Sequence, residues 1–92
     1  MTEGSLPRPD PNVVFKVLDQ EAVLVHLESN RIFTLTETGA RFWQLLVDGR
    51  DRPAIEQELL REYDVAEPEL VAEIDSLLRE LAAEGLVDQI AQ

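Results

Sequence analysis

Residues 13–35 read VVFKVLDQEAVLVHLESNRIFTL, a run in which three short segments rich in β-branched and aromatic residues are separated by polar residues. Segments of this length and composition are typical of β-strands. The separators are short enough for hairpin loops, and Asn30 is suited to a positive φ angle. We therefore expect a three-stranded antiparallel meander. The expected strands are residues 13–18, 22–27 and 31–35.

After Leu35 the spacing of apolar residues changes from two to about 3.6 residues, which predicts helices. Thr36 is a candidate N-cap, through its hydroxyl, for a first helix at residues 37–47. Asp48-Gly49 ends this helix, and Asp51 is a candidate cap for a second one, in which proline is tolerated in the first turn.

A third helix is expected after a turn at residues 64–68, and it ends at Gly85. Its apolar residues recur at helical spacing, so it is amphipathic. These residues are Leu70, Ile74, Leu77, Leu78 and Leu81. Three strands followed by three helices predict an α+β fold, in which the helices cover one face of the sheet. The same order of elements fits a winged helix-turn-helix.

The ends of the chain lack this patterning. Residues 1–12 contain three prolines and no periodic apolar residues, so we expect a flexible N-terminal arm. The expected domain spans residues 13–88, and residues 89–92 form a tail. With 92 residues and 45% hydrophobic composition, the chain has material for one hydrophobic core.

The residue inventory argues against catalysis. Cysteine is absent and His26 is the only histidine, which excludes a disulfide framework, a thiolate zinc site and a Cys/His nucleophilic pair within one chain. His26 lies in an expected strand, so a ring packed at the sheet is a better interpretation than a catalytic base. HExxH and GxxxxGK[ST] motifs are also absent. We expect no enzymatic activity, no cofactor and no metal.

The chain also lacks a secretion signal and a run of about 18 apolar residues, so we expect it to be cytoplasmic. Its 19 acidic and 8 basic residues give a formal net charge of −11. Because such a surface repels phosphates and anionic lipids, we expect neither nucleic acid nor membrane as a partner. A winged-helix DNA-binding regulator is an alternative. The third expected helix disfavours it, because Arg79 is its only basic residue.

An edge strand offers a different function. Its unpaired N–H and C=O groups allow an extended peptide to join the sheet as a further strand. The strand at 31–35 then provides the backbone ladder, and the last helix provides the wall of an apolar groove. Alternation places Phe33 and Leu35 on one face, where core packing is the commoner role. Ile32 and Thr34 lie on the other face and are the better candidates for contact.

Along the last helix, Ile74 has the spacing of a core residue, while Leu70, Glu73 and Leu77 lie toward one flank that a guest peptide can reach. We therefore predict a peptide-binding site formed by both elements. The predicted residues are Arg31, Ile32, Phe33, Thr34, Leu35, Leu70, Glu73, Ile74 and Leu77.

Several short motifs occur in a specific order along residues 13–88. They are Phe33-Thr34-Leu35 before the first helix, Trp43 with Leu45-Leu46, Asp48-Gly49, Tyr63-Asp64, and Leu81 with Gly85-Leu86-Val87. In this order and spacing the chain resembles the PqqD-like family, the recognition elements of pathways that modify ribosomally made peptides. The resemblance implies a winged fold of three strands and three helices. It also implies that a precursor leader binds as an added strand between the third strand and the third helix.

The resemblance has further implications for partners. Where the family often has aspartate near the start of the third helix, this chain has Glu73, which keeps the charge on a longer side chain. Free-standing members present the leader to a separate enzyme. The small, arginine-rich sequence is similar to lasso-peptide proteins, which work with a leader peptidase and a cyclase. The alternative is a peptide chaperone for a radical SAM enzyme, as in pyrroloquinoline quinone synthesis.

Overall fold

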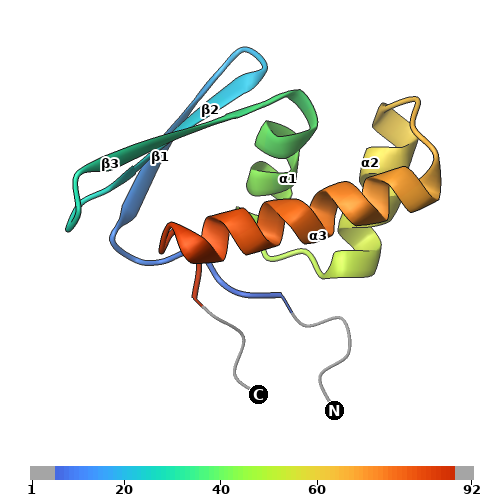
Figure 1. Cartoon of the computed structure of the whole chain (residues 1–92). Coiled ribbons are helices and arrows are strands. Elements are labelled where there is room, and N and C mark those ends of the chain that lie inside the picture. The colour runs from blue at the N-terminus through green and yellow to red at the C-terminus, as the bar shows by residue number, and fades with distance from the viewer. Residues whose placement is uncertain (1–5, 89–92) are drawn as a thin grey trace.

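The computed structural model describes residues 6–88, which form a three-stranded antiparallel sheet followed by three helices (Figure 1). The strands are ordered β1-β2-β3, so β2 is central and both of its neighbours are edge strands. The α+β fold predicted from the sequence is confirmed. The strands are β1 (Val13–Leu18), β2 (Glu21–His26) and β3 (Arg31–Thr36).

Strand β2 begins and ends one residue earlier than the sequence predicts, so the first hairpin loop is shorter and the second is longer than expected. Leu18 pairs with Glu21, so Glu21 belongs to β2, and Asp19 turns the chain with a φ of 57°. At the second hairpin His26 pairs with Arg31, and Leu27 belongs to the loop. Asn30 has a φ of 60°, as expected for a residue that tolerates the left-handed region.

The helices cover the face of the sheet that carries Ala22 and Leu24, both fully buried. Trp43 is also fully buried, and its ring meets Phe15 of β1 edge to face at a centroid distance of 5.8 Å. This contact joins the helical layer to the first strand. The helices are α1 (Glu37–Val47), α2 (Arg52–Glu62) and α3 (Glu67–Ala83).

The helix ends follow the expected signals except at the starts of α1 and α3. Thr36 occupies the N-cap position of α1, but its hydroxyl makes no capping hydrogen bond. The next residue, Glu37, still belongs to the strand ladder, because its N–H donates to the carbonyl of Gln20 at 2.7 Å, and its φ of 48° differs from that of a regular first helical turn. At the other end of the helical layer, Gly85 follows α3 with a φ of 74°, and the N–H of Leu86 donates back to Leu81.

The start of α3 also differs from the prediction. We expect a turn at residues 64–68, whereas the helix already begins at Glu67. Pro68 lies in its first turn, where the absence of an N–H costs no helical hydrogen bond.

The chain before β1 is more closely attached to the domain than the sequence predicts. Pro9 forms an antiparallel bridge with Val87, and the N–H of Asp10 donates to the carbonyl of Leu86 at 3.0 Å. The N–H of Asp88 donates to the carbonyl of Arg8 at 2.8 Å. The expected flexible arm is therefore corrected for residues 6–12. Residues 1–5 and the tail at 89–92 lie outside the described residues.

The cap of α2 provides a stability test. The carboxylate of Asp51 accepts a hydrogen bond from the N–H of Ala54 at 3.0 Å. Asp51→Ala is expected to lower the free energy of unfolding by about 1 kcal/mol, because it leaves a helix donor without this partner. Urea unfolding followed by the fluorescence of Trp43, the only tryptophan, measures the change. Asp64→Ala removes an exposed carboxylate outside the helices and is the matched control. Equal loss in both variants would contradict the capping role.

Candidate functional site: the open edge of β3 and the facing flank of α3

Strand β3 has one edge that no segment within residues 6–88 pairs with. Hydrogen bonding alternates along an antiparallel pair. The bond from Glu37 to Gln20 continues the register of β2 and β3, so Phe33 and Leu35 are the residues that exchange hydrogen bonds with β2. The N–H and C=O groups of Ile32 and Thr34 therefore point away from β2. They form a ladder that a further strand can use.

Helix α3 runs beside this edge, in the direction opposite to β3 (Figure 1). Two observations identify the flank that faces the strand. At Gly39, the position of a Cβ atom would lie 3.6 Å from Leu35 and 3.9 Å from Leu77, so both side chains border the same space. Farther along, Arg31 Nη2 lies 3.1 Å from Glu84 Oε1. The facing flank consists of Glu73, Leu77, Glu80 and Glu84, which recur at helical spacing.

The charges of this flank differ from those of the neighbouring helix. On α2, the carboxylates of Glu56 and Glu62 lie 2.7 Å and 3.0 Å from the guanidinium groups of Arg52 and Arg41. A hydrogen bond from Arg61 lowers the pKa of the Glu58 carboxyl below its ordinary value.

Glu73 and Glu80 of α3 are exposed, and neither has an ion pair within the described part of the chain. The wall facing β3 thus combines a half-buried leucine, Leu77, with two carboxylates, Glu73 and Glu80, that no arginine of the described chain neutralises. It is suited to an extended peptide with an apolar side chain and basic residues nearby.

The structure brings six of the predicted residues to the groove. Arg31, Ile32 and Thr34 are exposed and Phe33 is half-buried at the strand edge, while Glu73 and Leu77 lie on the facing flank. Ile32 is 69% exposed, the largest fraction among the exposed large hydrophobic residues of the described chain.

The other three predicted residues lie in the core. Leu35, Leu70 and Ile74 are 5%, 0% and 1% exposed. For Leu70 this corrects the expected position on an accessible flank. Leu70 falls on the same stripe as Ile74 and Leu81, which packs into the core. These residues support the groove from below, and a guest peptide cannot touch them in this conformation.

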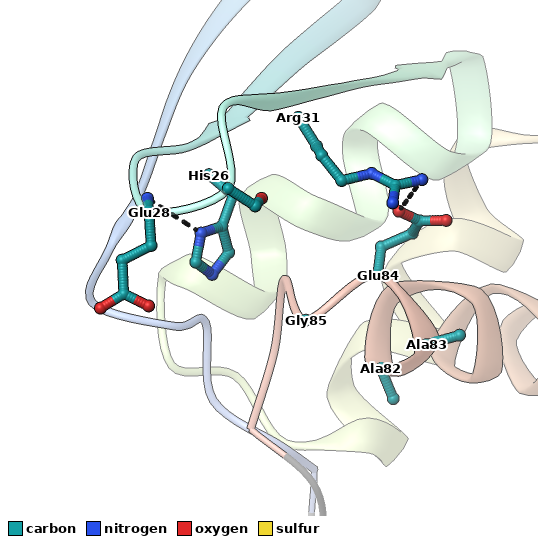
Figure 2. Close-up of a pocket in the computed structure, with 8 residues that line it drawn as sticks. His26, Glu28, Arg31, Ala82, Ala83, Glu84 and Gly85 are labelled. Atoms are coloured by element: carbon teal, nitrogen blue, oxygen red, sulfur yellow. Dashed lines mark hydrogen bonds and ion pairs between the residues drawn. The ribbon is translucent and has the colours of Figure 1, made fainter.

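The sequence prediction missed the far end of the groove. Here a pocket of about 410 Å³ lies between the β2–β3 loop and the last turn of α3 (Figure 2). Arg31 and Glu84 border it on one side, and the ring of His26 lies on the other. Helical spacing could have predicted Glu84 as a groove residue. It continues the stripe of Glu73, Leu77 and Glu80 and extends the predicted flank by two turns. The preference for His26 as a packed ring is confirmed, since it is 8% exposed.

Within residues 6–88, no cluster of three or more His, Cys, Asp or Glu side chains is arranged to hold a metal ion. None of the helices in this range has the length and apolar character needed to cross a membrane.

A three-stranded sheet, an open strand edge and an α2–α3 helix pair define a small winged helix-turn-helix domain of the α+β class. Residues 21–87 match the family described as Coenzyme PQQ synthesis protein D (PqqD). The chain belongs to the PqqD family, and the resemblance inferred from its motifs is confirmed.

Two solved structures are similar to nearly the whole chain. One is "TbiB1 in Complex with the TbiA(beta) Leader Peptide", with a TM-score of 0.86 and 32% identity, covering 92% of this chain and 99% of that one. The other is "Lasso peptide synthetase B1 complexed with the leader peptide", with a TM-score of 0.83 and 26% identity, covering 92% of this chain and 100% of the other. No curated protein matches the chain.

Proposed function

We propose that this chain binds the leader segment of a ribosomally made precursor peptide and presents it to a separate processing enzyme. The observation that carries this proposal is the outward-facing backbone of Ile32 and Thr34, beside a helix flank with a half-buried leucine. In this role the leader joins the sheet as a fourth strand next to β3. Its alternate side chains lie over Phe33 and Leu77.

The two similar structures support this assignment, because one contains TbiB1 and the other lasso peptide synthetase B1, each in complex with a leader peptide. We infer that the processing enzyme is the leader peptidase and cyclase system of a lasso-peptide pathway. The chain itself acts as a non-catalytic adaptor in the cytoplasm. The DNA-binding alternative gains no support from α3, whose exposed surface carries Glu67, Glu69, Glu73 and Glu80 with Arg79.

Titration of fluorescein-labelled peptides against the purified chain tests the proposal by fluorescence anisotropy. The peptides are the TbiA(β) leader peptide and the leader and core segments of any precursor peptide found to be encoded near the gene of this chain. Leader segments are expected to bind at micromolar concentration or below, and the core segment to bind far more weakly. Failure of every leader to bind would refute the proposal. Pull-down of the peptidase with and without leader then tests presentation.

Charged substitutions at the groove provide a second test. Ile32→Asp and Leu77→Asp are each expected to weaken leader binding by about tenfold, because they place a carboxylate where the guest strand packs. Anisotropy measures the affinity, and thermal unfolding shows that the variants fold.

Each substitution has a matched control. Val14 and Ile32 flank Val25 on the outer face of the sheet, but Val14 belongs to the opposite edge strand, so Val14→Asp adds the same charge away from the groove. Ala72→Asp does the same on the exposed side of α3. If Ile32→Asp and Leu77→Asp bind leader as well as these controls do, the guest strand does not lie between β3 and α3.

A further inference from the structure

The pocket at the Arg31 end of the groove is continuous with the proposed leader site. Arg31 begins β3, and Ala82 and Glu84 belong to the end of α3, so both walls of the groove extend into the pocket. A guest strand that follows the edge from Thr34 to Ile32 next reaches this position. The pocket has a volume of about 410 Å³, which is enough for more than one residue.

The floor of the pocket contains a hydrogen-bond donor on a largely buried ring. The N–H of Glu28 donates to His26 Nδ1 at 3.3 Å. Because Nδ1 accepts this bond, the ring proton lies on Nε2, which is therefore a donor. Nε2 has no hydrogen-bond partner among residues 6–88, and it is not one of the polar atoms sealed from solvent there, so a guest can reach it although most of the His26 side chain is buried.

Figure 2 shows the ring directed from the strand toward the segment that holds Gly85. A Cβ atom at Gly85 would lie 4.0 Å from Nε2, so the absence of a side chain keeps the space in front of this nitrogen open. An acceptor supplied by a guest can bond to this donor in place of solvent, with the modest net gain of one neutral hydrogen bond.

The rim of the pocket restricts the charge of the guest. Arg31 and the Glu84 carboxylate border the pocket as an ion pair, whereas Figure 2 shows the Glu28 carboxylate directed away from it. A guest carboxylate would compete with Glu84 for Arg31, and an ammonium group would meet the N–H of His26 at the floor. An uncharged group that accepts at its inner side and donates toward a rim carboxylate satisfies both sets of partners.

We propose that the His26 pocket is a specificity subsite that takes a hydroxyl or carboxamide side chain of the leader, namely serine, threonine, asparagine or glutamine. This inference rests on the proposed function. In this subsite His26 Nε2–H donates to the guest oxygen, and Glu84 accepts from the guest O–H or N–H. The Arg31–Glu84 pair adjusts at little cost, since the two side chains are 66% and 31% exposed.

NMR spectroscopy observes the donor directly, because His26 is the only histidine and gives a single set of ring signals. The ¹⁵N-labelled chain is titrated with the TbiA(β) leader peptide. Addition of peptide is expected to shift the amide signals of Ile32 and Thr34 together with the Nε2–H signal. Shifts at β3 without any change at the ring would overturn the subsite and leave the proposed function intact. No shift at β3 would remove both.

Peptide variants then identify the chemical class. Each residue of the TbiA(β) leader is replaced in turn by threonine, valine, aspartate or lysine. Threonine and valine have similar shapes, so their difference isolates the hydroxyl. At one position, threonine is expected to bind about fivefold more tightly than valine, and aspartate and lysine to bind more weakly than threonine.

Variants of the protein connect this preference to the ring. His26→Phe keeps a planar side chain and removes the donor, so the preference for threonine over valine is expected to disappear. His26→Gln retains an N–H donor and is expected to keep part of it. Amide spectra of both variants confirm the fold. A threonine preference that is equal in His26→Phe and the unmodified chain, or absent at every position, would overturn the assignment.

Discussion

Thr34→Pro is expected to weaken leader binding by about 100-fold while the domain remains folded. The N–H of Thr34 points away from β2 and forms no part of the ladder within the sheet, so its removal breaks no hydrogen bond of the folded domain. Proline is tolerated at such edge positions. A guest strand, in contrast, loses a donor, leaves one of its own carbonyl groups without a partner and meets the pyrrolidine ring.

The sheet offers a symmetric control. In β1 the bond from the N–H of Leu27 to the carbonyl of Asn12 fixes the alternation, so the N–H of Val17 also points away from β2, at the opposite edge. Val17→Pro therefore makes the same change on the other side of the sheet and is expected to leave leader affinity within about twofold. Isothermal titration calorimetry measures both affinities. Loss in Val17→Pro and not in Thr34→Pro would show that β1 is the strand that receives the leader.

Trp43→Ala is expected to lower the free energy of unfolding by about 3–5 kcal/mol. The ring is fully buried between the helical layer and Phe15, and its removal leaves a large cavity. Domains of this size are stabilised by about 5–15 kcal/mol, so the loss is a large part of the total. Urea unfolding followed by circular dichroism measures it, because the variant lacks its fluorescent residue.

Two further variants separate the causes of this loss. Trp43→Phe keeps most of the apolar contact, and it removes an indole N–H that has no hydrogen-bond partner within the described chain, so a much smaller loss is expected. Val47→Ala, on the same helix, truncates a side chain that is 41% exposed, and we expect a change below about 1 kcal/mol. If Trp43→Ala is no more destabilising than Val47→Ala, the contact with Phe15 does not hold the two layers together.

The fold was predictable from sequence because local signals and tertiary packing agree. Asn30 takes the positive φ that its turn requires, Asp51 caps α2, and Gly85 follows α3 in the left-handed region. The errors arise where the folded chain departs from a local signal. The Thr36 hydroxyl makes no cap, and the ladder between β2 and β3 extends to Glu37, whose φ of 48° is not that of a regular helical turn. The pairing of Pro9 with Val87 joins residues far apart in the chain, which no local pattern indicates.

The site was predictable in part, for a related reason. Strand alternation placed Ile32 and Thr34 correctly on the exposed face. Leu70 was assigned to the wrong side of α3, because helical spacing alone does not show which of two adjacent stripes meets the sheet. His26 is the last residue of β2, and it reaches the groove only because the fold brings it next to Gly85, which is distant in sequence. The side-chain class that we propose for the guest therefore depends on residues that come together only in the folded structure.

The bridge between Pro9 and Val87 has a practical consequence for protein engineering. It brings the two ends of the described chain next to each other, on the far side of α3 from β3 in Figure 1. A linker attached at either of these ends begins at a point away from the strand edge that we assign to the leader. This geometry favours tethering the domain to a catalyst or a fluorescent reporter at either terminus without obstructing the groove.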